Sequence, residues 1–426
     1  MNSVPTGPST ASIHPPISPS TDFASLGLIQ PLRRAIEDEG YCTPTPIQCR
    51  AIPPVVAGSD LLGCAQTGTG KTAAFALPIL QRFSQVRRDA PRRGGRALVL
   101  TPTRELALQI AESFRTYGRH LRVSVATVFG GVGQMPQVGA LARGVDVVIA
   151  TPGRLLDLIG QGHARFGSLE MLVLDEADRM LDMGFLPDVR RILATLPANR
   201  QTLLFSATMP RAVLDLARGI LRDPVEITVA PSATTVEGVT QRVMYVERAD
   251  KRALLMDVLQ DPSMRRALVF TRTKHGANRL ARQMGQLPGG VEVIHGNKSQ
   301  NARQAALSRF KDGRTRVLVA TDVAARGLDV DGVTHVVNFE VPSEPESYVH
   351  RIGRTARAGA QGIALSLCDS EERASLRDIE RVTRKPIEVV ADHPYRSRVP
   401  HASAAPHARP GAGQHRRGIR RRRRRF

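Results

Sequence analysis

A glycine-rich segment at residues 65–72, with the sequence AQTGTGKT, carries the residue types that bind phosphate. It follows a short apolar run and precedes a helical pattern over residues 72–81, which is the strand, loop and helix order of a phosphate loop. Gly68 and Gly70 can adopt backbone angles that other residues avoid, so that successive N–H groups can surround phosphate oxygens. The segment predicts a nucleoside triphosphatase, against the alternative of a chance glycine-rich turn.

Two side chains at the end of this loop can supply a charge and a metal ligand. Lys71 brings a positive charge to the β- and γ-phosphates, and the Thr72 hydroxyl is suited to hold Mg²⁺. The strict pattern of such loops begins with Gly, whereas this chain has Ala65. The other nucleotide-binding residues expected in the loop are Gln66, Thr67, Gly68, Thr69 and Gly70.

An acidic cluster directly follows the apolar run at residues 171–174. A carboxylate at the carboxyl end of a parallel strand lies where ligands bind in open α/β sheets. Asp175 can hold Mg²⁺ through water, and Glu176 is suited to orient and deprotonate an attacking water molecule. The alternative is a solvated acidic start of a helix, which also suits the helix dipole. The phosphate loop upstream favours the metal and base roles.

Both clusters need a sheet that presents the ends of its strands together. Through residues 21–229, short apolar runs of strand length alternate with helical patterns. This alternation predicts an α/β domain with a parallel sheet covered by helices on both faces. The predicted strands of this domain are 60–64, 96–100, 145–150, 171–174 and 201–205.

The same alternation restarts after residues 230–240, a small and polar segment with the composition of a linker. A second α/β domain is therefore predicted over residues 241–390, with no residue-level repeat of the first. Its predicted strands are 266–271, 291–294, 316–320, 335–339 and 362–367.

The chain of 426 residues is strongly basic, with 60 Lys and Arg against 39 Asp and Glu and a formal net charge of +21. Such an excess predicts a polyanionic partner, although GC-rich coding would also enrich Arg. Residues 1–20 carry no charged side chain and residues 391–426 have only one acidic residue, so we expect a disordered leader and a disordered Arg-rich tail. We interpret the tail as a non-specific anchor for this polyanionic partner, against the alternative of a neutral solvated segment.

The cysteines and the apolar runs restrict the compartment. Cys42, Cys49, Cys64 and Cys368 form no CxxC pair, so neither a zinc site nor a disulfide framework is predicted. No apolar run is long enough to span a membrane, and the N-terminus has no secretory pattern. These features predict a cytoplasmic protein.

The two clusters together resemble the DEAD-box RNA helicases, and further motifs agree with that resemblance in order along residues 20–390. The wording at 268–280 and 295–303 is closest to the bacterial RhlE-type group. The resemblance implies two tandem RecA-like domains and an ATP-dependent RNA helicase. The motifs are GYCTPTPIQ (40–48), PTREL (102–106), GG (130–131), TPGR (151–154), SAT (206–208), FTRT (270–273), QNAR (300–303), ATDVAARGLD (320–329) and HRIGRTAR (350–357).

The resemblance implies a nucleotide site that is selective for ATP. Gln48 would read adenine with its amide, which donates and accepts at once, and Phe23 lies at the spacing of an aromatic that stacks on the base. Asp329 would bind the ribose hydroxyls. Tyr41 and Gly327 complete the implied nucleotide-binding set.

Catalysis would also need groups from the second domain. The resemblance makes Arg354 and Arg357 arginine fingers that reach the γ-phosphate, and their spacing would place both on one helix face. The alternative is a solvated basic face. Ala356 departs from the Gly that the family usually has there; we expect Ala to keep helical geometry equally well and to preserve activity.

The remaining motifs imply RNA contacts that go largely to phosphate and sugar, so recognition should be largely independent of sequence. The implied RNA-binding residues are Pro102, Arg104, Gly130, Gly131, Thr151, Gly153, Arg154, Thr271, Arg272, Gln300, Arg303 and Thr321. The implied residues that couple ATP to RNA are Asp178, Ser206, Thr208, His350 and Arg351.

The predicted function is RNA-stimulated ATP hydrolysis that unwinds short or structured duplexes or strips proteins from RNA. An RNA-binding or annealing protein whose basic tail dominates is the main alternative, and DNA unwinding is a third. We expect a monomer, and ribosomal or RNA-decay complexes are compatible partners.

Overall fold

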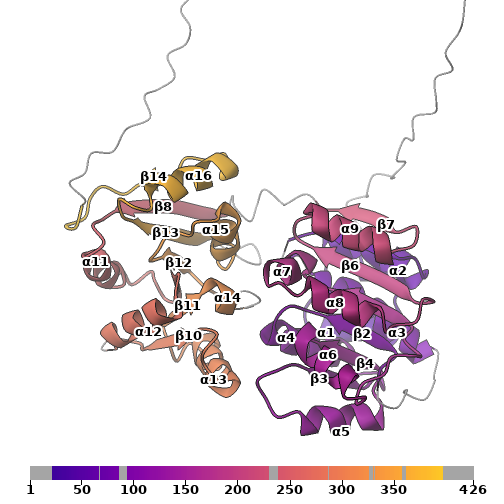
Figure 1. The fold of residues 1–426 in the computed structure, drawn as a ribbon. Coiled ribbons are helices and arrows are strands. Elements are labelled where there is room, and N and C mark those ends of the chain that lie inside the picture. The colour runs from indigo at the N-terminus through magenta and orange to yellow at the C-terminus, as the bar shows by residue number, and fades with distance from the viewer. Residues whose placement is uncertain are drawn as a thin grey trace, which may run out of the picture.

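The computed structural model of the chain describes residues 22–66, 68–85, 94–229, 238–285, 287–325, 330, 332–356 and 361–396. Two bodies are visible in Figure 1, and each is built on a seven-stranded sheet. The predicted leader, most of the linker and tail, and the site residues Thr67, Gly327, Asp329 and Arg357 lie outside the described residues.

The first sheet has the strand order β3-β4-β2-β5-β6-β1-β7, and neighbouring strands run parallel. Its strands are β1 (Leu61–Cys64), β2 (Ala97–Leu100), β3 (Val125–Val128), β4 (Val147–Ala150), β5 (Met171–Leu174), β6 (Gln201–Ser206) and β7 (Val225–Thr228). The surrounding helices are η1 (Phe23–Leu26), α1 (Gln30–Asp38), α2 (Pro46–Val56), α3 (Lys71–Gln85), α4 (Arg104–Tyr117), α5 (Met135–Arg143), α6 (Pro152–Gly160), α7 (Ala177–Asp182), α8 (Leu186–Leu193) and α9 (Arg211–Ile220).

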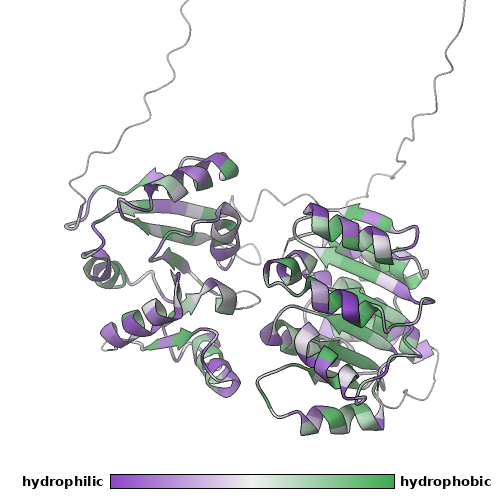
Figure 2. Ribbon diagram, viewed as in Figure 1, coloured by the Kyte–Doolittle hydropathy of each residue, from purple (hydrophilic) through white to green (hydrophobic). Residues whose placement is uncertain are grey.

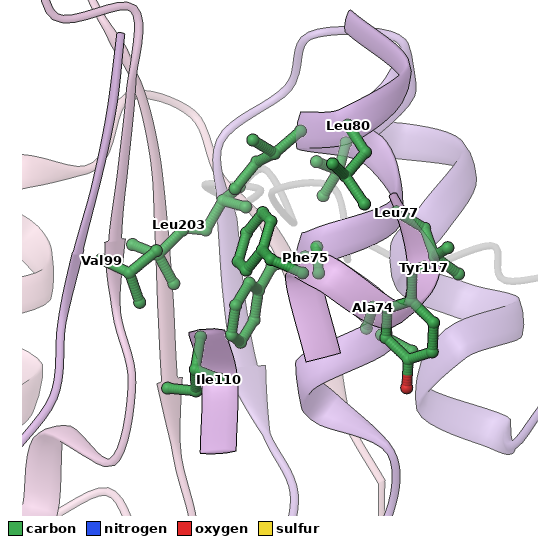
Figure 3. Close-up of a cluster of buried hydrophobic side chains, with 14 of the residues drawn as sticks. Ala74, Phe75, Leu77, Leu80, Val99, Ile110, Tyr117 and Leu203 are labelled. Atoms are coloured by element: carbon green, nitrogen blue, oxygen red, sulfur yellow. The ribbon is translucent and has the colours of Figure 1, made fainter. Parts of the chain in front are cut away.

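Alternating side chains of these strands feed two cores, one on each face of the sheet. Val99 and Leu203 join the core under η1 and α1–α4, whereas Leu98 and Leu204 join the core under α5–α9. Figure 3 shows Phe75 of α3 in the first core, where its ring lies 6.3 Å from that of Phe114. Burial of one such ring stabilises the fold by about 2 kcal/mol, so this core fixes the helix that begins at the phosphate loop.

The second sheet has the order β10-β11-β9-β12-β13-β8-β14 and is also parallel. Its strands are β8 (Val239–Tyr245), β9 (Ala267–Thr271), β10 (Val291–Ile294), β11 (Val317–Thr321), β12 (His335–Asn338), β13 (Gly362–Cys368) and β14 (Glu388–Val389). Its helices are α11 (Lys251–Val258), α12 (Lys274–Gln283), α13 (Gln300–Lys311), α14 (Asp322–Ala325), α15 (Pro345–Ile352) and α16 (Arg373–Thr383). The buried side chains of α12 and α13 enter two different cores, on opposite faces of the sheet.

All ten predicted runs are strands, and the α/β class is confirmed. The sequence analysis missed β3, β7, β8 and β14. Three of these are sheet edges, and the edge strands β3 and β7 have partly exposed side chains, so their apolar signal is weak. β8 begins at Val239, inside the segment predicted to be linker, and pairs with β13.

The second body also continues past residue 390, where we placed the start of the tail. Val246 forms an isolated antiparallel bridge with Arg396. Tyr395 packs against the core that contains Leu254 and Leu255. The folded part therefore includes residues 391–396, which we had assigned to the tail. No helix among the described residues has the length and apolarity that a membrane span requires.

Candidate active site and RNA-binding surface

The predicted site residues of the first body gather at the carboxyl ends of its strands. The phosphate loop follows β1, Asp175 follows β5, and Ser206 ends β6; these three strands are neighbours in the sheet. The predicted RNA-binding residues follow β2, β3 and β4, which occupy the other half of the same edge. One sheet edge therefore carries a nucleotide half and an RNA half side by side.

The phosphate loop adopts the glycine-dependent backbone that its sequence predicts. Gly68 and Gly70 have φ values of 86° and 89°, in the left-handed region that favours glycine. Lys71 is buried, and its Nζ donates a hydrogen bond to the Ala65 carbonyl oxygen at 2.8 Å. Lys71 thus satisfies a carbonyl group of its own loop.

Gln48 is attached to the same loop from the first turn of α2. Its Oε1 accepts a hydrogen bond from the Thr45 backbone N–H at 2.9 Å, and its Nε2 donates to the Gly70 carbonyl at 3.2 Å. Phe23 is buried in the first core, whereas Tyr41 is exposed. The geometry connects Gln48 directly to the phosphate loop, which the sequence did not predict.

Asp175 has the properties of a metal ligand. It is buried, and its Oδ1 has no hydrogen-bond partner among the described residues. Burial raises the pKa of Asp175 to about 7, although the charge of Lys71 opposes the shift. A buried, unpartnered carboxylate oxygen beside a phosphate loop fits the coordination that Mg²⁺ prefers. Thr72, at the second position of α3, could supply a hydroxyl ligand to the same ion.

Glu176 occupies a strained backbone position between β5 and α7. Its φ of 56° lies in the left-handed region, which costs a non-glycine residue about 1–2 kcal/mol. Burial opposes ionisation of its carboxyl group, but Arg179, Lys71 and Arg354 outweigh that effect and keep its pKa below the ordinary value. Arg179 also donates a hydrogen bond to Glu176 Oε2. The residue is thus held as a carboxylate, which a general base requires.

Asp178 joins the acidic cluster to the end of β6. Its Oδ2 accepts hydrogen bonds from the backbone N–H of Thr208 at 2.8 Å and from the Thr208 hydroxyl at 2.9 Å. The Ser206 hydroxyl accepts from the Asp178 N–H and donates to the Thr208 carbonyl at 2.7 Å. This closed network connects Asp178, Ser206 and Thr208, three of the five residues predicted to couple ATP to RNA.

The RNA half of the edge forms a second cluster. The Arg104 guanidinium lies so close to Gly131 that a Cβ at that position would be 2.0 Å from Nη1. Arg154 Nη1 donates to the Val132 carbonyl at 3.3 Å, from the helix that begins after β4. Both arginines therefore lie against the loop after β3, and α4 and α6 begin at the same edge. Basic side chains beside helix N-termini suit phosphate groups.

The second body contacts this edge of the first sheet through α13. Gln300 Nε2 donates to Glu105 Oε1 at 3.2 Å, and Arg303 Nη2 forms an ion pair with the same oxygen at 2.9 Å. Glu105 is buried at the start of α4. Two predicted RNA-binding residues therefore contact a carboxylate of the other domain, and this bridge connects the two bodies.

Arg272, also predicted to bind RNA, makes contacts within the second body. Its guanidinium donates to the Val341 carbonyl at 2.9 Å and to Glu372 Oε1 at 2.6 Å. Glu372 also receives an ion pair from the buried Lys251. The side chain of Arg272 therefore anchors β9 to α16 instead of pointing freely at a ligand. Thr271 and Thr321 lie at the ends of β9 and β11, with little exposed surface.

Arg351 and Arg354 lie at the end of α15. Arg351 is fully buried and holds Asp322 with two hydrogen bonds of 2.6 and 2.7 Å. Arg354 Nε donates a hydrogen bond to the His350 carbonyl at 3.2 Å. The positive charge of Arg354 helps to lower the pKa of Glu176 in the first body. The second body therefore brings a guanidinium to the nucleotide half of the first sheet.

The helical geometry predicted for this segment is wrong. α15 ends at Ile352, so Arg354 follows the helix and does not lie on its face. Ala356 has a φ of 55°, in the left-handed region that favours glycine. Our argument that Ala preserves the backbone of this position is therefore incorrect, because the backbone there is not helical.

Residues 45–216 match the DEAD/DEAH box helicase family, and residues 250–359 match the helicase conserved C-terminal domain. The DEAD-box ATP-dependent RNA helicase CshA of Bacillus cereus is 43% identical over 365 residues, which cover 86% of this chain and 69% of that protein. The RNA helicase CrhR of Synechocystis is 42% identical over 371 residues, 87% of this chain and 74% of that protein. The chain belongs to the DEAD-box family of ATP-dependent RNA helicases.

Solved helicase structures agree with this assignment. The chain superimposes on Saccharomyces cerevisiae Dbp5 bound to RNA and ADP BeF3 with a TM-score of 0.78 and 30% identity, over 87% of this chain and 96% of that one. Mss116p bound to ssRNA and AMP-PNP gives a TM-score of 0.77 and 29% identity, over 87% and 80% of the two chains. The tandem RecA-like architecture of a DEAD-box helicase is thereby confirmed, while the RhlE-type subgroup stays a prediction.

Sequence reasoning missed two residues of this DEAD-box site. Arg179, which pairs with Glu176, follows it by three positions and could have been found from helix spacing. Glu105 stands between Arg104 and an apolar residue, and no local signal marks its contact with a helix nearly two hundred residues later.

Proposed function

We propose that RNA binding and ATP binding close the two domains on each other, and that closure both activates hydrolysis and separates a short RNA duplex. The observation that carries this proposal is that Gln300 and Arg303 of the second body contact Glu105 of the first at 3.2 and 2.9 Å, and the charge of Arg354 helps to lower the pKa of Glu176. A site divided between two bodies is complete only when they meet. The closed form then stabilises the charge that develops on the transferring phosphoryl group.

Within this proposal, each residue of the nucleotide half has a defined task. The loop at 65–72 would hold the phosphates, with Lys71 released from the Ala65 carbonyl to neutralise their charge. Thr72 and Asp175 would hold Mg²⁺, which supplies positive charge to the β- and γ-phosphates when bound. Glu176 would orient and deprotonate the attacking water molecule. Arg354, with Arg357, would stabilise charge on the phosphoryl group.

RNA would bind along the other half of the edge through Arg104, Arg154 and the loop after β3. Such contacts address the backbone, so we propose binding that is largely independent of sequence. Because the Glu105 bridge joins the RNA half to domain 2, RNA would favour the same closed form as ATP. Each ligand should then raise the affinity for the other. We further propose a monomer in the cytoplasm, acting on structured RNA of ribosomal or decay complexes.

The test is Glu176→Gln with RNA and DNA strands of equal length. We expect RNA, and not DNA, to stimulate ATP hydrolysis by the unchanged protein. The variant should bind ATP and RNA but lose hydrolysis by about 10²–10⁴-fold. Full retention of hydrolysis by the variant would contradict the role of Glu176, and duplex separation by the unchanged protein that does not depend on ATP would contradict the proposal. Equal stimulation by DNA would contradict the choice of RNA.

A further inference from the structure

The second domain has a basic groove whose lining contains none of the site residues described above. It has a volume of about 680 Å³ and lies between α12 and the β10 edge of the sheet. We call it the α12 groove. It is lined by His275, Asn278, Arg279, Ala281, Arg282, Val293 and Lys298.

The polar residues of the α12 groove follow helical spacing. His275, Arg279 and Arg282 are exposed and lie on one face of α12, four and three positions apart. Lys298 reaches the groove from the loop between β10 and α13. Figure 2 shows α12 as mostly hydrophilic. The groove therefore concentrates positive charge on a surface that a ligand can reach.

This charge is not neutralised by the protein. Arg279, Arg282 and Lys298 form no side-chain hydrogen bond or ion pair within the described parts of the chain. The acidic residue of β10, Glu292, instead pairs with Arg309 at 2.6 Å. Val293, its neighbour in the strand, lines the groove, so Glu292 faces the opposite side of the sheet.

Other surface helices of this protein treat their arginines differently. On α9, Asp215 lies 3.5 Å from Arg218, and on α16, Asp378 lies 3.0 Å from Arg381. α12 contains no acidic residue. Burial and the charges of Lys298, Arg303, Lys274 and His275 lower the pKa of His295 beside the groove, which agrees with a locally positive potential.

The location of the groove connects it to the RNA side of domain 2. α12 begins directly after β9 and the predicted contact Thr271, and Lys298 precedes Gln300 by two residues. From this carboxyl edge, α12 runs back along the sheet. A strand that leaves the space between the two domains past Lys274 would therefore meet the groove next.

We propose that the α12 groove binds the phosphate backbone of RNA that extends beyond the segment held between the domains. The lining favours RNA over an acidic protein, because Ala281 and Val293 are its only apolar members and offer no pocket for a buried anchor. Arg and Lys side chains suit phosphate oxygens. The groove would increase affinity for long or structured RNA and would leave the hydrolytic site unchanged.

This proposal rests on the proposed function, and its test separates the two. The variant is Arg279→Glu with Arg282→Glu, which reverses two exposed charges. The matched control is Arg377→Glu with Arg381→Glu on α16, which makes the same change in net charge near the opposite edge of the sheet. Affinity is measured for a short RNA that fits only between the domains and for the same RNA with a single-stranded extension, over a range of salt concentrations.

We expect the groove variant to bind the extended RNA about tenfold more weakly and to lose about 0.7 of salt slope for each phosphate contact removed. Its affinity for the short RNA and its RNA-saturated hydrolysis should equal those of the unchanged protein. Equal loss in the control variant would overturn the proposal, as would unchanged affinity for the extended RNA. Failure of the unchanged protein to bind either RNA would instead overturn the proposed function.

Discussion

The two sheets present functional residues at corresponding edges but hold them in different ways. In the first domain, Lys71, Asp175 and Glu176 are all buried, and each is placed by groups of its own domain. In the second, Arg354 follows the end of a helix, and Arg303 finds its acidic partner across the domain boundary. Under the proposed function, the first domain thus holds an assembled but incomplete site, and closure adds the guanidinium group of Arg354 from the second domain.

Removal of Arg354 tests this difference between the domains most strongly, through RNA-saturated ATP hydrolysis. We expect Arg354→Ala to lower RNA-saturated ATP hydrolysis by about 10³-fold, because the first domain cannot replace the missing charge. ATP affinity, which depends on the first domain, should change little. Steady-state hydrolysis and nucleotide titration measure the two quantities. A variant that instead loses ATP binding would show that the second domain helps to assemble the ground-state site. Arg354→Lys is the control that keeps the charge and loses the planar fork.

Disruption of the Glu105 bridge should weaken closure without touching the nucleotide half. We expect Glu105→Gln to raise the RNA concentration for half-maximal hydrolysis about tenfold, since a buried charge on Arg303 loses its partner. Arg303→Gln and the double variant complete a double-mutant cycle. If the effects of the two single changes simply add, the bridge does not contribute to closure.

The buried carboxylate of Asp175, when charged, should lower the free energy of unfolding of the first domain. Its pKa is near 7 in the folded protein and about 3.9 in an unfolded chain, so between these values the folded state binds the extra proton. Stability should therefore fall as pH rises from about 4 to 7. Asp175→Asn should raise the Tm at pH 8 by about 2–4 °C, as measured by thermal unfolding of the nucleotide-free protein, and abolish hydrolysis. An unchanged Tm would mean that Lys71 fully compensates the charge.

The left-handed backbone at Ala356 should cost the second domain a smaller amount. Ala356→Gly should stabilise it by about 1 kcal/mol, because glycine adopts this conformation without strain. Val at the same position should destabilise it. Denaturant unfolding measures both changes. If hydrolysis by the glycine variant is at least equal to that of the unchanged protein, the strain has no catalytic purpose.

The tail beyond Arg396 should have the smallest effect on turnover. A truncation must spare Tyr395, which belongs to the core of the second domain. We expect truncation after Arg396 to raise the RNA concentration for half-maximal hydrolysis and to flatten its salt dependence, because basic residues leave the chain. RNA-saturated turnover should stay nearly constant. A large fall in that turnover would contradict the anchor role.

The sequence was most informative where one short segment contains the whole physical cause. Residues 171–174 are apolar on both faces and run directly into Asp175, so both the buried strand and the site at its end could be predicted. Val239 begins a seven-residue strand in which only Val239 and Val243 are buried, so its apolar signal is weak, and the small polar residues before it are typical of a linker. Backbone geometry after a helix end, as at Ala356, depends on packing against Gly362 and has no local signature.

For the site too, residues with contacts to distant segments of the chain could not be predicted from the sequence. The contacts of Gln48 with the phosphate loop and of Glu105 with α13 join segments far apart in the chain. Only the fold brings them together; the sequence analysis assigned Gln48 to adenine and gave Glu105 no role. Arg272 and Arg303 were assigned to RNA from the resemblance alone, and in the structure both contact carboxylates.

The hydrogen bonds from Lys71 to Ala65 and from Gln48 to Gly70 tie the two ends of the phosphate loop to groups of its own domain. Each is worth about 1 kcal/mol. Under the proposed function, Lys71 exchanges the Ala65 carbonyl for phosphate oxygens. The net contribution of Lys71 to nucleotide affinity is then smaller by about that amount, a factor of about five.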